Sequence, residues 1–192
     1  RFVFIDESYL KTLKPRELIC GLAEVIKYAA IFDAKLFRTL EEKMDEIVRG
    51  RGDGLEAIVR RCCELKAHVV ERDEKETLGL RAKLNFGHTL GHAVESLTHY
   101  KKYTHGEAIA MGMVYAARQS VARAGFPAKD VERLKALIER AGLPTEMPAF
   151  PKAAYRKALM QDKKRVSSQL HFVYLNKIGK SDVIPTPFDE VI

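Results

Sequence analysis

Most of this chain places apolar residues three or four positions apart, which is the spacing of amphipathic helices. After Asp33, which can cap a helix, Leu36, Phe37 and Leu40 keep this rhythm, and Pro15 marks the start of an earlier helix. Further helices are predicted over residues 54–72, 128–141 and 151–161. The chain is therefore expected to be mainly helical.

Strand patterns occur only near the two ends of the sequence. Residues 1–6 are predicted to form a short strand that begins abruptly, as in a chain cut from a longer protein. Near the C-terminus, Leu170, Phe172 and Tyr174 alternate with polar or smaller residues, and residues 182–184 can pair with them. The expected fold class is mainly α, a multihelical domain with a small C-terminal β-hairpin.

The composition is that of a globular protein, with 192 residues, 46% hydrophobic and 31% charged. No apolar run approaches the roughly 20 residues that span a bilayer, and the N-terminus lacks the pattern of a signal peptide. Cys20, Cys62 and Cys63 form no Cys-x-x-Cys pair and are predicted to be buried reduced thiols. We expect a cytoplasmic protein with no membrane partner.

The net charge of +7 suits an anionic partner, but the basic residues are dispersed among acidic ones. No basic arm or aromatic-interleaved patch is present, so we expect a small phosphorylated or carboxylated substrate and no nucleic acid. No glycine-rich phosphate loop follows a predicted strand. A nucleotide cofactor would therefore need another domain.

Four of the six histidines lie between His88 and His105. His88 and His92 are four residues apart in a predicted helix, so both rings project from one face. His105 stands at the first turn of the next predicted helix, where a neutral ring can donate a lone pair to a metal ion. The three rings could form a zinc site, or they could be ordinary polar residues. Thr89 replaces the base of a His-Glu-x-x-His metalloprotease, so peptide hydrolysis is not indicated.

Glu24 and Lys27 form a second candidate group. They are three residues apart on the helix that begins at Pro15, so their side chains are neighbours. A surface ion pair is the common interpretation of this spacing. Small or apolar residues such as Gly21 and Ala23 surround the pair in sequence, which is unusual for solvated charges. A functional role therefore remains open.

Several separated motifs occur in a fixed order. They are Gly-Leu-Ala-Glu-Val-Ile-Lys-Tyr at residues 21–28, Asp73-Glu74-Lys75-Glu76, the stretch from Arg81 to Glu95, His105-Gly106-Glu107, and Asp162-Lys163-Lys164. With these motifs, the sequence resembles the C-terminal domain of 3-dehydroquinate synthases over essentially its whole length. The resemblance implies that residues 1–192 are the helical C-terminal domain of a two-domain enzyme whose N-terminal NAD-binding domain is absent from this chain.

The resemblance also implies an activity, that of a carbon–oxygen lyase of the shikimate pathway, which serves aromatic amino acid biosynthesis. These enzymes convert 3-deoxy-D-arabino-heptulosonate 7-phosphate into 3-dehydroquinate and phosphate by oxidation, elimination, reduction and aldol cyclisation. The implied cofactors are Zn²⁺ or Co²⁺, and NAD⁺ held mainly by the N-terminal domain. We expect the full-length enzyme to be a homodimer and the isolated chain to be inactive.

By position, the resemblance implies that the metal ligands are Glu24, His88 and His105, so His92 leaves the ligand set for an acid–base role. One carboxylate and two imidazoles leave metal positions open for substrate hydroxyls. The implied catalytic residues are His92, Lys27 and Glu76. The implied substrate contacts are Lys66, Arg81, Asn85, Lys163 and Lys164, and the fork of Arg81 suits the substrate carboxylate.

Two alternatives remain. The first is another sugar phosphate cyclase or a metal-dependent polyol dehydrogenase, although Gly91-His92-Ala93 favours the dehydroquinate branch of the cyclases. The second is a non-catalytic helical interaction domain whose histidines are structural. Metal content separates the second alternative from the two enzyme hypotheses.

Overall fold

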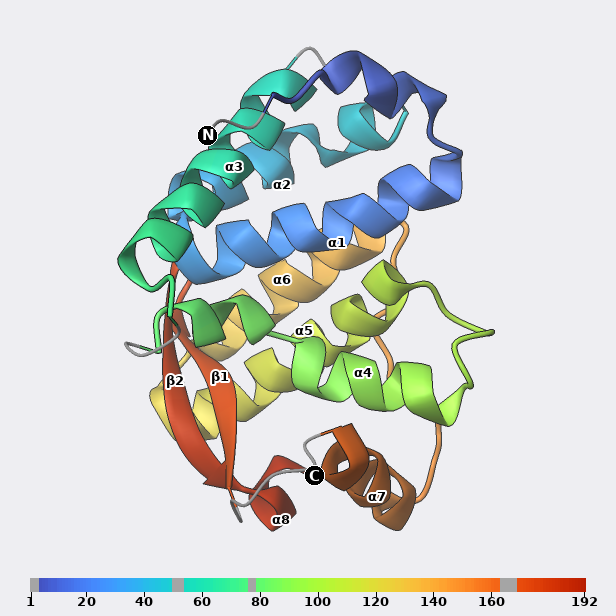
Figure 1. The fold of residues 1–192 in the computed structure, drawn as a ribbon, viewed down its shortest axis with the longest axis vertical. Helices are drawn as coiled ribbons and strands as arrows, with labels where there is room; N and C mark the ends of the chain where they lie inside the picture. Colours follow the sequence, from blue (N-terminus) through green and yellow to red (C-terminus); the bar gives the residue numbers. More distant parts are fainter. Residues whose placement is uncertain (1–3, 50–53, 76–78, 163–168) are drawn as a thin grey trace.

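The computed structural model describes residues 4–49, 54–75, 79–162 and 169–192, which form helices and one two-stranded sheet (Figure 1). The elements in chain order are η1 (Glu7–Thr12), α1 (Pro15–Phe32), α2 (Ala34–Val48), α3 (Leu55–Arg72), η2 (Arg81–Asn85), α4 (His88–Leu97), α5 (His105–Ala124), α6 (Ala128–Arg140), α7 (Lys152–Asp162), β1 (Gln169–Lys177), β2 (Lys180–Pro187) and α8 (Phe188–Val191).

Helix α1 crosses the middle of the molecule, between α2 and α3 on one side and α4 and α5 on the other (Figure 1). Most of its residues from Leu22 to Ile31 are buried. A helix that packs on several sides buries more than one stripe of its surface. The side chain of Lys27 is therefore buried, and that of Glu24 is partly buried.

Helices α4 and α5 approach closely through Gly112 of α5. A Cβ atom at this position would overlap the carbonyl group of Gly87, the residue that precedes α4. Only glycine allows this approach, because the group that a Cβ atom would overlap is backbone, which cannot rotate away as a flexible side chain can. The start of α4, with His88, therefore lies against α5.

The N-terminus of α5 is tied to α1 by several contacts. Thr104 and Glu107 form a capping box at the start of α5. Both oxygens of Glu107 also accept from Arg16 of α1, at 3.0 and 2.8 Å. The backbone N–H of Gly106 donates to Cys20 Sγ at 3.2 Å. His105 consequently stands at a fixed place beside α1.

The predicted C-terminal hairpin is confirmed. β1 and β2 pair antiparallel, with Phe172 opposite Ile184 and Tyr174 opposite Asp182. Val173 is buried as well as its two neighbours, so the burial does not follow the simple alternation of the sequence. The Ser120 hydroxyl of α5 accepts from the backbone N–H of Leu175 and joins the hairpin to the helices.

The predicted helix starts at Pro15 and after Asp33 are also confirmed, and Asp33 accepts from the backbone N–H groups of Lys35 and Leu36. The predicted strand at the N-terminus is wrong for residues 4–6, because Asp6 instead caps η1. Residues 1–3 lie outside the described part of the chain. No helix among the described residues is long and apolar enough to cross a membrane.

Candidate metal centre

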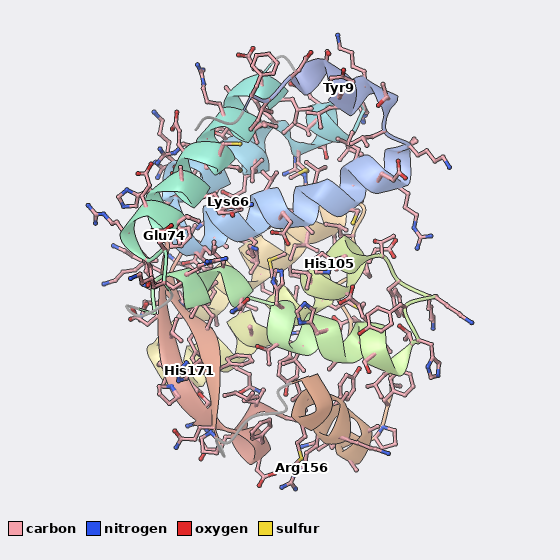
Figure 2. All side chains as sticks on the ribbon, in the orientation of Figure 1. Tyr9, Lys66, Glu74, His105, Arg156 and His171 are labelled. Atoms are coloured by element: carbon pink, nitrogen blue, oxygen red, sulfur yellow. The ribbon has the colours of Figure 1, made fainter. Side chains whose placement is uncertain are left out.

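Two overlapping groups of side chains could hold a metal ion among the residues that the structure describes. Glu24, His88 and His105 form one group, and His92, Glu95 and His105 form the other. In each group, one ligand atom from every residue lies within 4.8 Å of the others. Figure 2 shows the shared residue, His105, between the ribbons of α1 and α4.

The first group converges on one carboxylate oxygen. Glu24 Oε1 lies 3.4 Å from His88 Nε2 and 3.8 Å from His105 Nε2. A tetrahedral Zn²⁺ with bonds of about 2.0–2.1 Å keeps its ligand atoms about 3.4 Å apart. Both distances from Glu24 Oε1 are therefore close to the separation that a zinc ion requires.

The protons of the two rings face away from this point of convergence. His88 Nδ1 lies 3.2 Å from the carbonyl oxygen of Phe86, and His105 Nδ1 lies 3.1 Å from Glu95 Oε1. A carbonyl oxygen and a carboxylate accept hydrogen bonds, so each Nδ1 carries the proton. Each Nε2 then presents a lone pair toward Glu24.

Glu24 Oε1 is the buried polar atom that a cation would satisfy. The side chain of Glu24 is about one-third exposed, but Oε1 itself is buried and has no hydrogen-bond partner among the described residues. Most buried polar atoms in proteins have a partner. Three lone pairs that meet without a hydrogen between them fit a divalent cation.

The environment keeps Glu24 ionised. Burial acts to raise the pKa of Glu24, but the proximity of His88 and of the Lys27 ammonium outweighs it and lowers the pKa to about 2. A carboxylate must be deprotonated to bind a metal ion. Glu24 therefore meets this condition throughout the physiological pH range.

Lys27 holds the other oxygen of Glu24. Its Nζ lies 2.6 Å from Glu24 Oε2, and the residue is only 3% exposed. Burial lowers the pKa of Lys27 more than Glu24 raises it, and the charge of Lys66 lowers it further. Lys27 is the more deeply buried partner, so burial disfavours the charged form of Lys27 more than that of Glu24. Lys66 itself is exposed on α3 (Figure 2).

His92 lies next to the Glu24 group but outside it. Its ring centroid is 5.5 Å from that of His88 and 6.1 Å from that of His105. The sequence alone left open a site made of His88, His92 and His105, and the ligand atoms of that trio do not form one of the two groups within the described residues. The geometry favours Glu24 as the third ligand and leaves His92 beside the metal position.

The predicted substrate contacts lie on elements around this centre. Arg81 begins η2, where its backbone N–H donates to Asp73 Oδ2 at 3.0 Å and its Nη1 reaches the Glu74 carbonyl at 3.5 Å. Asn85 ends η2 and is exposed. The structure thus places Arg81 and Asn85 near the start of α4 without joining them to the ligand triad. Glu76, Lys163 and Lys164 lie outside the described residues.

The sequence interpretation missed Glu95. It stands seven residues after His88 and three after His92, so all three share one face of α4. This spacing is the signal that could have identified it. Glu95 is 8% exposed, and its carboxylate contacts His105 from the side opposite to Glu24.

Curated proteins of known name match almost the whole chain. The 3-dehydroquinate synthase of Geobacter metallireducens is 47% identical over 184 residues, which cover 96% of this chain and 51% of that protein. The 3-dehydroquinate synthase of Caldanaerobacter subterraneus subsp. tengcongensis is 45% identical over 192 residues, which cover 100% of this chain and 54% of that protein. The chain spans about half the length of these curated relatives.

Solved structures share the fold. A 2-epi-5-epi-valiolone synthase from Streptomyces hygroscopicus subsp. jinggangensis, with NAD⁺ and Zn²⁺ bound, matches with a TM-score of 0.85 and 25% identity over 97% of this chain and 52% of that one. A 2-deoxy-scyllo-inosose synthase complexed with carbaglucose-6-phosphate, NAD⁺ and Co²⁺ matches with a TM-score of 0.81 and 28% identity over 100% of this chain and 55% of that one.

The fold and the sequence motifs therefore lead to one family. Its model, described as 3-dehydroquinate synthase C-terminal, matches residues 21–165, a range that includes Glu24, His88, His92 and His105. The chain belongs to the 3-dehydroquinate synthase C-terminal family.

Proposed function

We propose that residues 1–192 are the metal- and substrate-binding C-terminal domain of a 3-dehydroquinate synthase, and that an NAD-binding domain outside this sequence completes the enzyme. The chain corresponds to about half of its curated relatives, with 51% and 54% of their lengths covered. We further propose that the complete enzyme is a cytoplasmic homodimer. In this assignment, the chain alone holds the metal ion but lacks the site for the hydride carrier.

The proposed reaction converts 3-deoxy-D-arabino-heptulosonate 7-phosphate into 3-dehydroquinate and phosphate. The observation that carries the proposal is the convergence of Glu24 Oε1, His88 Nε2 and His105 Nε2 around a buried oxygen that has no hydrogen-bond partner among the described residues. Zn²⁺ or Co²⁺ held by Glu24, His88 and His105 would act as a Lewis acid and would lower the pKa of a substrate hydroxyl, which would favour its oxidation by NAD⁺. Three protein ligands leave coordination positions for such hydroxyls.

His92 is the proposed proton carrier. Its ring lies beside both liganding rings, at 5.5 and 6.1 Å between centroids, so it can reach a substrate held at the same point. A positioned imidazole is well suited to transfer protons near neutral pH. His92 would transfer a proton in the deprotonation of the hydroxyl and in the elimination of phosphate.

Lys27 and Lys66 make the substrate side of α1 and α3 positive. The ammonium of Lys27 donates one hydrogen bond to Glu24, which leaves two N–H groups for substrate oxygens. Lys66 is close enough to lower the pKa of Lys27, so both charges act on the same region. Because Glu24 balances one of these two charges, a net positive charge remains, and it favours an anionic substrate.

The other predicted contacts complete this proposal. Arg81 and Asn85 are proposed to bind the substrate, with the planar guanidinium of Arg81 on its carboxylate. Lys163 or Lys164 is proposed to bind the phosphate, and Glu76 to assist proton transfer, as the family resemblance implies.

A different sugar phosphate cyclase is the second candidate. The fold similarity to a valiolone synthase and an inosose synthase favours it, because these proteins share the helical architecture at TM-scores of 0.85 and 0.81. The identities of 25% and 28% are, however, well below the 47% and 45% to relatives named 3-dehydroquinate synthase. Sequence similarity therefore favours the dehydroquinate reaction.

Phosphate release by the full-length enzyme tests the proposal. The enzyme, loaded with Zn²⁺ and NAD⁺, is expected to release phosphate from the heptulosonate phosphate and not from other heptulose or hexose phosphates. Release only from another sugar phosphate would support the second candidate. The 192-residue chain with added NAD⁺ should be inactive, and turnover by it would contradict the proposed division into two domains.

A further inference from the structure

Glu95 is a buried carboxylate aimed at a metal ligand. Its side chain is 11% exposed, and Oε1 lies 3.1 Å from His105 Nδ1. The next turn of the chain reinforces this placement, because the backbone carbonyl of Glu95 accepts from the N–H of Tyr100 at 2.8 Å and so fixes the end of α4. The carboxylate is thus presented from a helix whose C-terminal end is hydrogen-bonded to the following turn.

His105 needs such a contact more than His88 does. The side chain of His105 is 46% exposed, whereas that of His88 is 14% exposed and is confined by its surroundings. An exposed side chain in the first turn of a helix keeps several rotamers unless another group holds it. The hydrogen bond to Glu95, at 3.1 Å, is shorter than the 3.8 Å contact of the same ring with Glu24, so it restricts the ring orientation more strongly.

We propose that Glu95 is a positioning residue of the metal centre, which accepts the Nδ1–H of His105 and holds Nε2 toward Glu24. This inference rests on the metal site of the proposed function. Outer carboxylates commonly orient histidine ligands in this way, and their loss typically weakens metal binding about 10- to 100-fold. Glu95 acts through His105 and is not itself a ligand.

The second metal group, His92, Glu95 and His105, does not fit as well. An ion bound between Glu95 Oε1 and His105 Nδ1 would replace the hydrogen bond that joins these atoms at 3.1 Å. Glu24 Oε1, in contrast, is buried without a partner among the described residues. The oxygen without a hydrogen-bond partner therefore belongs to the first group. Glu95 contacts this group through His105 Nδ1, the ring nitrogen that faces away from Glu24.

Zinc affinity of the full chain tests this role. We would measure the Kd for Zn²⁺ by competition with a fluorescent chelator in the wild type, Glu95→Ala, Glu95→Gln and Asp130→Asn. Asp130 is a matched control, because it is a buried carboxylate (7% exposed) that pairs with Arg133 on α6. Glu95→Ala should weaken binding about 10- to 100-fold. Glu95→Gln, whose amide oxygen can still accept from Nδ1, should recover part of the loss, and Asp130→Asn should bind as the wild type does.

The outcomes separate the inference from the function on which it rests. If the wild type binds no zinc, the metal centre itself is absent. If the wild type binds zinc and Glu95→Ala binds equally well, the metal centre stands and the role of Glu95 is overturned. If Glu95→Ala and Glu95→Gln both lose zinc as completely as His88→Ala, Glu95 is a ligand and its positioning role is overturned.

A measurement without substitution covers the case in which Glu95→Ala does not fold. In the zinc-loaded wild type, ¹⁵N NMR of the imidazoles should show the proton of His105 on Nδ1 and the metal on Nε2. A metal-bound Nδ1 would overturn the proposal, because Glu95 could then accept no hydrogen bond from that atom.

Discussion

Lys27 Nζ lies 2.6 Å from Glu24 Oε2, one turn further along α1. This contact divides the two oxygens of the carboxylate between two tasks. Oε2 satisfies the buried ammonium, and Oε1 points to the two imidazole Nε2 atoms. The ion pair therefore orients the carboxylate that we propose as a metal ligand, and this accounts for charged residues in the buried part of a central helix.

The first prediction concerns the pH dependence of stability. The pKa of Glu24 is lowered from 4.5 to about 2 in the folded chain. A depressed carboxyl pKa contributes stability above the unfolded pKa, and that contribution is lost as the pH falls through the folded pKa. The metal-free wild type should therefore lose stability between about pH 4.5 and pH 2, and Glu24→Gln should lose less across this interval.

Thermal unfolding of both proteins in the presence of a chelator, at intervals from pH 6 to pH 2, measures this effect. The difference in Tm between the wild type and Glu24→Gln should shrink as the pH falls. Parallel curves would show that Glu24 titrates alike in the folded and unfolded states.

The second prediction concerns the contact between α1 and α5. A Cβ atom at Gly106 would overlap the backbone carbonyl of Cys20, so Gly106→Ala forces the two helices apart. Such overpacking typically costs about 1–3 kcal/mol. Zinc affinity should fall as well, because the same contact sets the place of His105 relative to Glu24.

Gly21→Ala is the matched control for this change. Gly21 lies inside α1, one residue from Cys20, and nothing approaches within 4 Å of an added Cβ. Alanine in a helix interior is more favourable than glycine by about 0.5–1 kcal/mol. Urea unfolding should therefore show a stabilised Gly21→Ala and a destabilised Gly106→Ala. Equal effects of the two substitutions would contradict the close contact.

Local signals account for the parts of the fold that the sequence predicted. Pro15 and Asp33 act within one turn, so the starts of α1 and α2 could be recognised without tertiary information. The apolar residues Phe4 and Ile5 gave the sequence the pattern of a strand, but a strand needs a partner strand. Instead, the hydrogen bond from the Ser8 N–H to Asp6 caps a 3₁₀ helix. The four-residue helix α8 is too short to leave a periodic pattern.

The metal site was only partly predictable for a similar reason. His88 and His92 are close in sequence, so their shared face follows from helical spacing. The approach of Glu24 to His88 depends on how α1 and α4 both pack against α5, which no local pattern encodes. The resemblance to a family was needed to identify Glu24. Glu95 has the helical spacing that places it on the same face as His88 and His92. It was not identified from the sequence as a site residue, because a glutamate in a helix is usually exposed to solvent.

The third prediction concerns the reactivity of Cys62. All three cysteines are free thiols, as predicted, but their exposure is intermediate, so the predicted burial is only partial. Burial, with a contribution from Cys63, raises the pKa of Cys62 to about 12. Because the thiolate is the reactive form, Cys62 should resist iodoacetamide at pH 8 in the folded chain. Peptide mapping should show alkylation of Cys62 only in denaturant, and rapid labelling of the folded chain would contradict its burial.

The last prediction separates the proposed roles of His88 as a metal ligand and of His92 as a proton carrier. His88→Ala removes one of three ligands, so the protein should not retain zinc, and the stabilisation of about 2.7 kcal/mol expected at a zinc concentration of 100 Kd should disappear. His92→Ala should keep stoichiometric zinc but lower kcat about 10²- to 10⁴-fold, the usual contribution of an acid–base residue. Metal analysis after gel filtration, together with phosphate release by the full-length enzyme, measures both effects. Because His92 also belongs to the second candidate metal group, loss of zinc from His92→Ala with retention in His88→Ala would move the ion to Glu95 and His105 and overturn the assignment of Glu24.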